Sequence, residues 1–423
     1  NDSKKGGCLM VSAQSPRIVI TGVGALTPLG NSFSEIGDAL QAGQSGIDWY
    51  EAGTFGRLQK HAAASVKEVL NRTENVRVLP SEQFDKFSRI EQFMIGPAAS
   101  ALADADINLT VENSVQKKRI GIIAGIGAEH LKVWERDFLD NGREVFEATH
   151  QPSLVHQVAQ MLGINGPATT VAAACASSGY ALALGKTWLT SGLVDACVVG
   201  GCDVLSPTAL AAFHNLRALS RRDDDPQKAS RPFDRNRDGF VMGEGGVFFV
   251  LEKQHTAEQR QCKIYGELAG IGMSSDASHM VTPCSNPVQA SRAITEALAD
   301  ASLLPKQVDY INAHAAGTPV GDTAEAGAIR DAFGHSHSEI PVSSTKSMSG
   351  HLISAAAAFE ALACLVAIQR NIVPPTINLD EPDDDCHLRH VSHHSISSSI
   401  QVAASNSFGF GGSNLCLVLK SAA

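Results

Sequence analysis

Short apolar runs alternate along this chain with stretches of helical periodicity, and this alternation constrains its fold more than any other feature. The predicted strands cover residues 17–24, 119–126, 196–203, 247–251, 263–272, 308–313, 341–343, 398–405 and 414–420. The predicted helices cover residues 32–42, 84–105, 152–162, 287–302, 321–332 and 351–369. Strands and helices that alternate in this way predict an α/β protein whose strands are largely parallel and covered by helices.

A polar seam at 253–262 interrupts the alternation, which then restarts. We expect two α/β halves of related layout, 16–262 and 263–423, although their sequences share no clear residue-level repeat. Residues 1–15 are polar and rich in Gly, Ser and Lys, which is typical of a disordered leader or a cloning remnant. The alternating Arg and Asp residues of 231–239 predict a local ion-pair network that holds a loop.

The charge and the cysteine content argue against several classes of protein. With 44 acidic and 34 basic residues the net charge is −10, which disfavours a nucleic-acid-binding surface. No uninterrupted apolar run reaches the roughly 18 residues of a membrane span, so no membrane association is expected. The 9 cysteines are odd in number and lack the spacing of a disulfide framework, which favours reduced thiols and a cytoplasmic protein.

One stretch, residues 171–185, places a cysteine among unusually small side chains. An apolar run ends at Cys175, a helical pattern begins there, and the neighbours are Ala, Ser and Gly. The unpaired N–H groups and the positive dipole end of a helix start would lower the thiol pKa and favour a nucleophilic thiolate. A buried core cysteine is the alternative, since free cysteines are often buried. This stretch alone does not decide between the two, whereas Cys197 and Cys202 are interpreted as core residues.

Three further clusters of reactive residue types follow predicted strands in the second half. They contain His314, then Lys346 and His351, and finally the glycine-rich run 406–413. Each has an ordinary explanation alone: a hydrogen-bonded histidine, a surface lysine or a tight turn. Loops after parallel strands converge on one face of such a fold, so together the clusters predict an active site. Glu360 lies in an apolar helical run, where a carboxylate is costly unless it is paired.

These motifs together resemble the β-ketoacyl-[acyl-carrier-protein] synthases, and most closely the Cys-His-His condensing enzymes of type II fatty-acid synthesis. The resemblance runs in order from about 17 to 420 and rests on Cys175, Arg231-Pro-Phe-Asp, His314-Ala-Ala-Gly-Thr318-Pro, Lys346-Ser-Met-Ser-Gly-His351, Glu360, Pro374-Pro-Thr-Ile-Asn-Leu and Asn406-Ser-Phe-Gly-Phe-Gly-Gly. It implies a thiolase-like fold, with two related βα halves in a layered α-β-α-β-α arrangement, and a dimer.

The resemblance also implies an acyltransferase reaction. Cys175 would take an acyl group from a carrier-protein thioester, and the N–H groups of Cys175 and Phe408 would form the oxyanion hole. The phosphopantetheine arm of acyl carrier protein would deliver the substrates, so no metal and no organic cofactor is implied.

The second implied step is a decarboxylative condensation that yields a 3-ketoacyl product. Malonyl-carrier protein would lose carbon dioxide, and His314 and His351 would stabilise the resulting enolate. A neutral histidine that donates from Nε2 suits this task better than a general base. Lys346 and Glu360 would orient and polarise the site.

The residues that the resemblance places against the substrate are Thr318, Phe213, Ala128, Ile126, Gly409 and Gly411. The chain departs from the family pattern at Ala316, so that only Thr318 keeps a hydroxyl for pantetheine, and at Val281, where the family often has threonine. Either Ala128 or Ile126 aligns with the isoleucine that closes the floor of the acyl pocket. Ala128 at that position would admit long or rigid acyl chains.

The expected partners are a second copy of the chain and an acyl carrier protein. The acidic carrier would dock on a basic surface formed by Lys86, Arg89, Arg217, Arg221 and Arg222. The main alternative is a catalytic subunit that forms a heterodimer with a chain-length factor in a polyketide or polyene pathway.

A metal-binding protein is a further alternative, because the segment from Cys386 through His387, His390, His393 and His394 carries suitable ligand types. This segment follows a run of aspartates and lies outside the motifs above. A solvated polar loop is therefore the favoured interpretation.

Overall fold

The computed structural model describes residues 16–51, 60–67, 84–109, 119–127 and 153–422, together with positions 129, 131, 134, 135, 137 and 140–142. The predicted leader 1–15 and the pocket candidate Ala128 lie outside the described residues. The helices are α1 (Phe33–Ala42), α3 (Arg89–Asp104), α7 (Leu154–Leu162), α8 (Ser177–Thr190), α9 (Pro207–Asn215), α10 (Gln254–Gln259), α11 (Val288–Asp300), α12 (Pro319–Phe333), α13 (Lys346–Ser349) and α14 (Ala356–Arg370).

Eleven strands hydrogen-bond in the order β13-β11-β10-β15-β16-β9-β1-β8-β6-β4-β5. Their bounds are β1 (Ile18–Leu26), β4 (Ile120–Gly125), β5 (Ala168–Val171), β6 (Ala196–Asp203), β8 (Gly245–Lys253), β9 (Gly266–Ser275), β10 (Tyr310–Asn312), β11 (Pro341–Ser343), β13 (Arg389–His390), β15 (Val402–Gly409) and β16 (Ser413–Lys420). Two small sheets pair β12 (Ile372–Val373) with β14 (Ile396–Ser397), and β2 (Asp48–Tyr50), β3 (His61–Ala64) and β7 (Met242–Gly243) with one another.

The prediction of largely parallel strands is wrong for the middle of this sheet. The strands at its two ends pair in parallel, but β1, β8, β6, β9, β16 and β15 pair with their neighbours in antiparallel fashion along the central part. A tight glycine turn after Gly409 returns β15 directly into β16, so no helical crossover separates them. Strand β6 likewise re-enters as β8 after the long segment 204–244, which carries α9.

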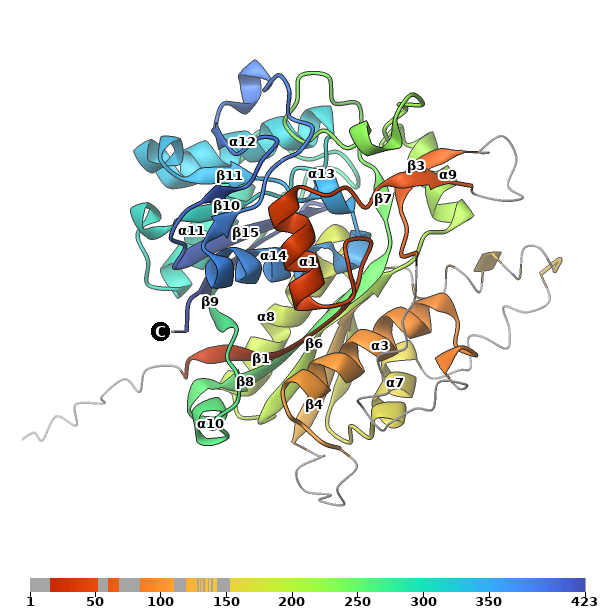
Figure 1. Ribbon diagram of the computed structural model, residues 1–423, viewed down its shortest axis with the longest axis vertical. Helices are drawn as coiled ribbons and strands as arrows, with labels where there is room; N and C mark the ends of the chain where they lie inside the picture. Colours follow the sequence, from red (N-terminus) through yellow and green to blue (C-terminus); the bar gives the residue numbers. More distant parts are fainter. Residues whose placement is uncertain are drawn as a thin grey trace, which may run out of the picture.

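The elements stack as the expected α-β-α-β-α layers (Figure 1). Helices α3 and α7 cover one outer face, strands from residues before 262 form the next layer, and α8 and α14 lie in the middle. Strands from residues after 262 and the helices α11 and α12 complete the stack. The two strand layers meet where Val19 pairs with Glu267 and Ile20 with Gly266.

Close packing of the two middle helices brings distant parts of the chain together. A Cβ added to Gly179 of α8 would lie 3.1 Å from the Ala357 Cβ of α14 and 2.3 Å from the Leu415 Cδ2 of β16. The segment Ile353–Arg370 is long and apolar enough for a membrane span by composition, yet 89% of it is buried inside the protein. Its apolar surface therefore serves the core.

Two helices begin later than their periodicity predicts. The pattern starts at 84, but α3 begins at Arg89, because the Ser88 N–H donates to the Glu91 carboxylate (2.6 Å) and closes the N-terminus. The pattern at 351–369 becomes a short 3₁₀ turn, η6 (Ile353–Ala355), followed by α14. This turn separates His351 from the helix and leaves its side chain free to face Cys175.

Candidate active site

Cys175 lies in a short 3₁₀ turn, η2 (Ala174–Ala176), between β5 and α8. The preceding residue Ala174 has a φ of 48°, a left-handed conformation that is uncommon outside glycine. The sulfur is buried, and it lines a cavity. The small residues that flank Cys175 in the sequence do not line this cavity, and Gly179 instead lets α8 pack closely against α14 and β16.

The expected low pKa of this thiol is wrong for the ligand-free site. Burial raises the pKa of Cys175 to about 11, although the charge of Lys346 and a hydrogen bond with the backbone of Phe410 act in the opposite direction. Loss of hydration therefore outweighs the stabilisation of the thiolate by its neighbours. A thiol close to the start of a helix therefore does not gain reactivity from the helix alone when burial removes its hydration.

Alkylation of Cys175 by iodoacetamide tests this pKa. The thiolate is the nucleophile, and its fraction rises about tenfold per pH unit below the pKa. The rate of alkylation of Cys175 should therefore rise about tenfold for each pH unit between about pH 7 and pH 9. Quantitative mass spectrometry of that peptide gives the rate. A plateau below about pH 8 would show that the pKa is lowered, as the helix argument predicts.

His351 contacts the sulfur directly. Its Nε2 lies 3.0 Å from the Cys175 Sγ, and its Nδ1 accepts the Ile353 N–H at 3.3 Å. Since Nδ1 accepts, the proton of the neutral ring is on Nε2. Burial, and then the charge of Lys346, hold the pKa of His351 well below its ordinary value, so the ring is a neutral donor.

His314 has the same tautomer for a different reason. The Lys346 Nζ donates to the His314 carbonyl oxygen at 2.6 Å and lies 3.4 Å from its Nδ1. A lysine ammonium group can only donate, so Nδ1 accepts and Nε2 carries the proton. Burial and the Lys346 charge lower the pKa of His314 well below its ordinary value. The rings of His314 and His351 are 5.4 Å apart and nearly perpendicular.

Glu360 has the partner that its apolar surroundings require. Its carboxylate is hydrogen-bonded to Lys346 and accepts the Ser407 hydroxyl at 3.3 Å. Both members of the ion pair are almost completely buried. Burial raises the pKa of Glu360 to about 7, against the opposing effect of Lys346. Lys346 is therefore a core residue and not a surface lysine.

The other predicted residues divide into two groups. The cavity is lined by Thr318, Phe213, Phe408 and Gly409, and by Val281 and Ala316, where the chain departs from the family pattern. Ile126 is buried in the apolar core and does not line this cavity. Gly411 stays outside it and donates its N–H to the Met280 carbonyl oxygen at 2.9 Å.

Phe410 is a residue that the sequence analysis missed. Its backbone hydrogen bond with the Cys175 thiol lowers the thiol pKa, whereas Phe408 lies two positions earlier with its ring 6.0 Å from that of His314. Both phenylalanines line the cavity. The repeated Phe-Gly pattern offered both residues, and only the course of the chain after β15 distinguishes them.

Two buried carboxylates that the sequence analysis also missed hold the loop after His314. Glu325 accepts the N–H groups of His314 (2.8 Å) and Ala315 (2.6 Å), and burial raises its pKa to about 7. Asp322 accepts the N–H groups of Gly317 and Thr318 near 3.2 Å, and burial raises its pKa to about 6. Both carboxylates lie in α12, 8 and 11 residues after His314, and this short spacing was the signal in the sequence that could have identified them.

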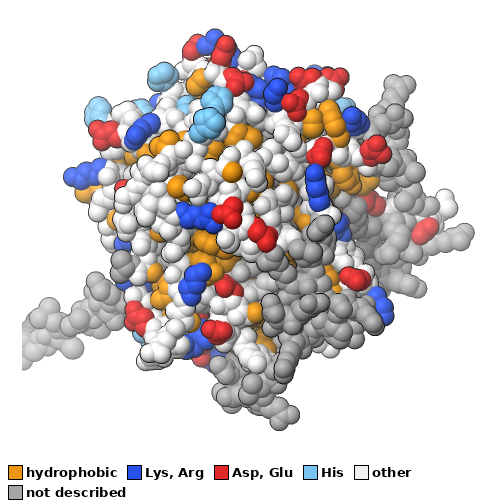
Figure 2. Space-filling model, viewed as in Figure 1, with side chains coloured by type: hydrophobic (Ala, Val, Ile, Leu, Met, Phe, Trp, Pro, Cys, Tyr) orange, Lys and Arg blue, Asp and Glu red, His pale blue; other side chains and the backbone are white. Residues whose placement is uncertain are grey.

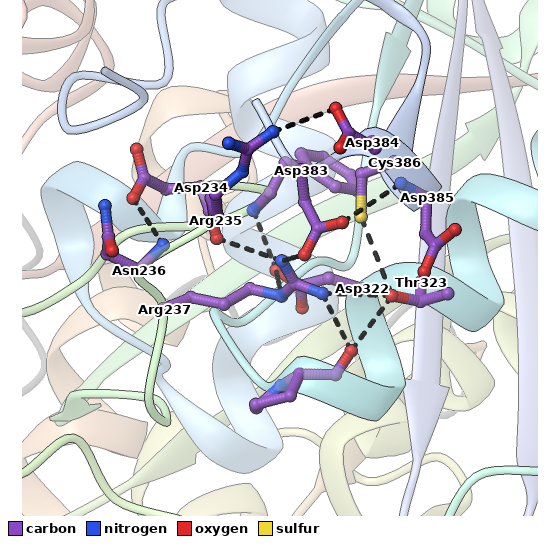
Figure 3. A network of polar contacts seen from close by, with 12 residues as sticks. Asp234, Arg235, Asn236, Arg237, Asp322, Thr323, Asp383, Asp384, Asp385 and Cys386 are labelled. Carbon is purple, nitrogen blue, oxygen red and sulfur yellow. Dashed lines mark hydrogen bonds and ion pairs between the residues drawn. The ribbon is translucent and has the colours of Figure 1, made fainter. Parts of the chain in front are cut away.

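The ion-pair network predicted in 231–239 is confirmed and extends further than a local loop (Figure 3). Arg231 pairs with Asp234 and Asp380, and Arg237 pairs with Asp383 at 2.6 Å and approaches Asp322 at 3.8 Å. The network therefore connects this loop to Asp322 at the start of α12 and to the segment 380–386.

The only grouping of three possible metal ligands within the described ranges is Cys175, His314 and His351, whose ligand atoms lie within 4.8 Å of one another. A metal would need the Nε2 lone pairs of both rings. The hydrogen bonds at both Nδ1 atoms place protons on Nε2 instead, so the donor set does not fit a metal ion.

The segment around Cys386 is not arranged as a metal site. The Cys386 sulfur is buried and faces the Thr323 hydroxyl at 3.8 Å, whereas the His390 Nε2 bonds to the Cys386 carbonyl oxygen at 2.7 Å. His387, His393 and His394 are exposed. The favoured interpretation of a polar loop holds for these three histidines but not for the buried cysteine.

Comparisons with known proteins agree with this geometry. Family models described as the beta-ketoacyl synthase N-terminal and C-terminal domains match residues 15–257 and 265–380. The chain is 37% identical over 420 residues to a 3-oxoacyl-[acyl-carrier-protein] synthase 2 of Synechocystis sp., covering 97% of this chain and 99% of that protein. It is 36% identical over 416 residues to the protein of the same name from Coxiella burnetii, covering 96% and 98%.

Solved structures give the same result for the fold. A beta-ketoacyl synthase from Burkholderia phymatum has a TM-score of 0.85 at 30% identity, with 96% of this chain and 100% of that chain covered. A type II polyketide ketosynthase, solved with its acyl-carrier protein and a hexaketide, has the same TM-score, identity and coverage. The ishigamide ketosynthase/chain length factor has a TM-score of 0.84 at 30% identity, with 97% and 100% covered.

Proposed function

Because the chain belongs to the β-ketoacyl synthase family, we propose that it catalyses the decarboxylative condensation of malonyl-carrier protein with a Cys175-bound acyl chain in fatty-acid synthesis. The observation that carries this proposal is the convergence of Cys175, His314 and His351 on one cavity, with both rings neutral and protonated on Nε2.

In the first step the Cys175 sulfur attacks the acyl thioester, a carbon–sulfur bond forms, and the carrier thiol leaves. Backbone N–H groups of Cys175 and Phe410 stabilise the oxyanion. The hydrogen bond between the Phe410 backbone and the Cys175 thiol supports Phe410 for this role over Phe408, the residue that the resemblance implies. The phosphopantetheine arm of the carrier enters through the cavity that Thr318 and Phe213 line. The chemistry requires no metal and no organic cofactor. The odd number of cysteines, without the spacing of a disulfide framework, supports a cytoplasmic protein.

In the second step malonyl-carrier protein loses carbon dioxide, and the electron pair of the broken carbon–carbon bond becomes the enolate. The Nε2–H groups of His314 and His351 stabilise its oxygen, because neutral donors need no proton transfer. The enolate carbon then attacks the Cys175 thioester. A carbon–carbon bond forms, the carbon–sulfur bond breaks, and the Cys175 thiolate takes up a proton to restore the thiol as 3-ketoacyl-carrier protein leaves.

Intact-protein mass spectrometry tests the whole sequence. After incubation with acyl-carrier protein, one acyl group should be found on Cys175, and its mass identifies the accepted chain length. Addition of malonyl-carrier protein should remove this group and produce the 3-ketoacyl product. If malonyl-carrier protein is consumed while no 3-ketoacyl product forms, the condensation assignment fails.

A catalytic subunit of a type II polyketide or polyene pathway is the second candidate. The similarity to a ketosynthase/chain length factor favours it, as does the similarity to a ketosynthase solved with its hexaketide. Condensation by the purified chain as a homodimer supports the fatty-acid assignment. Activity that appears only after a chain-length-factor subunit is added supports the alternative.

Docking of the acidic carrier is proposed to use exposed arginines near α9. Arg217 and Arg221 are exposed, as is Lys86, while Arg222 is half-buried. Arg89 is a weaker candidate than expected, since its guanidinium is bound by the buried Glu244 carboxylate. On the face drawn in Figure 2 basic and acidic side chains are interspersed, so any attraction is local.

Charge reversal checks this surface. Arg217→Glu or Arg221→Glu should raise the KM for carrier-bound substrate about three- to tenfold at low salt and weaken its salt dependence, with kcat nearly unchanged. Lys306→Glu, an exposed lysine on the short turn after α11, is the matched control. An unchanged salt dependence in both arginine variants would remove them from the docking surface.

A further inference from the structure

A buried polar pair, Asp203 and Ser354, lies behind the catalytic cavity. Asp203 ends β6, and its carboxylate accepts the Val204 N–H at 2.9 Å and the Ser354 N–H at 3.2 Å. The Ser354 hydroxyl also hydrogen-bonds this carboxylate and accepts the Gly127 N–H at 2.8 Å. Across the part of the chain that the structure describes, no ion pair includes Asp203. Burial raises the pKa of Asp203, and these hydrogen-bond donors act in the opposite direction.

The residue between His351 and this pair is strained. Ile353 has a φ of 48°, which is rare for a β-branched residue, and its side chain lines the cavity. Such a conformation persists only when the surroundings hold it. Its own N–H donates to the His351 Nδ1, and the next N–H, that of Ser354, donates to Asp203.

The end of β4 supports the turn from the other side. Gly127 comes so close that an added Cβ would lie 3.0 Å from the Ser354 Oγ. The Ser354 hydroxyl thus bridges two segments, one ending β6 and one following β4, and fixes the turn η6 between them. None of these contacts involves a reacting atom.

We propose that Asp203 and Ser354 are positioning residues for His351. They hold the strained Ile353 so that its N–H stays on the His351 Nδ1, and this keeps the proton on Nε2, where the enolate needs a donor. The inference rests on the proposed function for its catalytic consequence, but the tautomer of His351 is a property of the protein itself.

Ser354→Ala tests the proposal by removing the bridging hydroxyl with little change of volume. The kcat for malonyl decarboxylation should fall about tenfold, because the loss of a buried hydrogen bond loosens the turn, while the KM and the rate of Cys175 acylation change less than about twofold. Gly127→Ala should give the same pattern by pushing the hydroxyl away, and the two changes combined should be less than additive.

The matched control is Thr21→Val. The Thr21 hydroxyl is also buried and donates to a buried carboxylate, that of Glu252, at 2.7 Å, but neither residue lines the catalytic cavity. Thr21→Val should leave the kcat for decarboxylation nearly unchanged. If Thr21→Val and Ser354→Ala reduce the thermal midpoint and both half-reactions equally, the role of Ser354 is merely structural and the proposal is wrong.

Nitrogen NMR of the full chain with labelled histidine separates this inference from the proposed function. The ring-nitrogen shifts of His351, assigned with His351→Ala, should show the Nε2–H tautomer in the wild type and a mixture of tautomers in Ser354→Ala and Asp203→Asn. An unchanged His351 signal in both variants overturns the positioning role. A wild type that shows this tautomer but forms no acyl-enzyme overturns the proposed function instead.

Discussion

Cys175→Ala is expected to abolish acyl-enzyme formation and condensation completely. The Cys175 sulfur lines the cavity and lies 3.0 Å from the His351 Nε2, which places the nucleophile beside a residue that stabilises the enolate. Because the sulfur already faces a cavity, its loss should change the free energy of unfolding by only about 1 kcal/mol. Loss of activity without loss of the fold is therefore the expected result.

Intact-protein mass spectrometry and thermal denaturation measure the two effects in the same samples. Cys197→Ala removes a cysteine that is also buried but belongs to the apolar core, and it should keep the acylation of the wild type. A Cys175→Ala protein that still gains one acyl group from acyl-carrier protein would show that another residue is the nucleophile.

His314→Ala and His351→Ala should each reduce malonyl decarboxylation about 100- to 1000-fold, the effect of removing one oxyanion donor. His351 is buried and His314 half-buried, and both rings are neutral and protonated on Nε2, so they suit the developing charge of the enolate. Acylation of Cys175 should fall less, because backbone N–H groups stabilise the tetrahedral intermediate of that step.

Separate assays of the two half-reactions check this division of roles. Release of carbon dioxide from malonyl-carrier protein reports on the enolate, and the mass of the acyl-enzyme reports on Cys175. His255→Ala, which changes an exposed histidine in α10, serves as the control. An equal loss in both half-reactions would contradict separate roles for the histidines and the thiol, and would point to His351 as the base for Cys175.

Local sequence determined the elements of this protein and the residues that its chemistry needs. Ser32 caps α1 at the residue where the sequence predicts that helix to begin. Glu360 is buried in an apolar helix, where an unpaired carboxylate would be destabilising, and it has the cationic partner Lys346 that such a site requires. These features follow from sequence because each depends on neighbours along the chain or on a rule that every fold obeys.

The antiparallel centre of the sheet, the raised pKa of Cys175 and the roles of Phe410, Asp203 and Ser354 were decided only by the tertiary structure. Strand direction depends on the edge at which the chain re-enters the sheet. The pKa depends on how much water the whole fold excludes, and this outweighs the helix start that the sequence displays. Ser354 meets Asp203 and Gly127 across more than 150 residues of chain, a contact that no local pattern encodes.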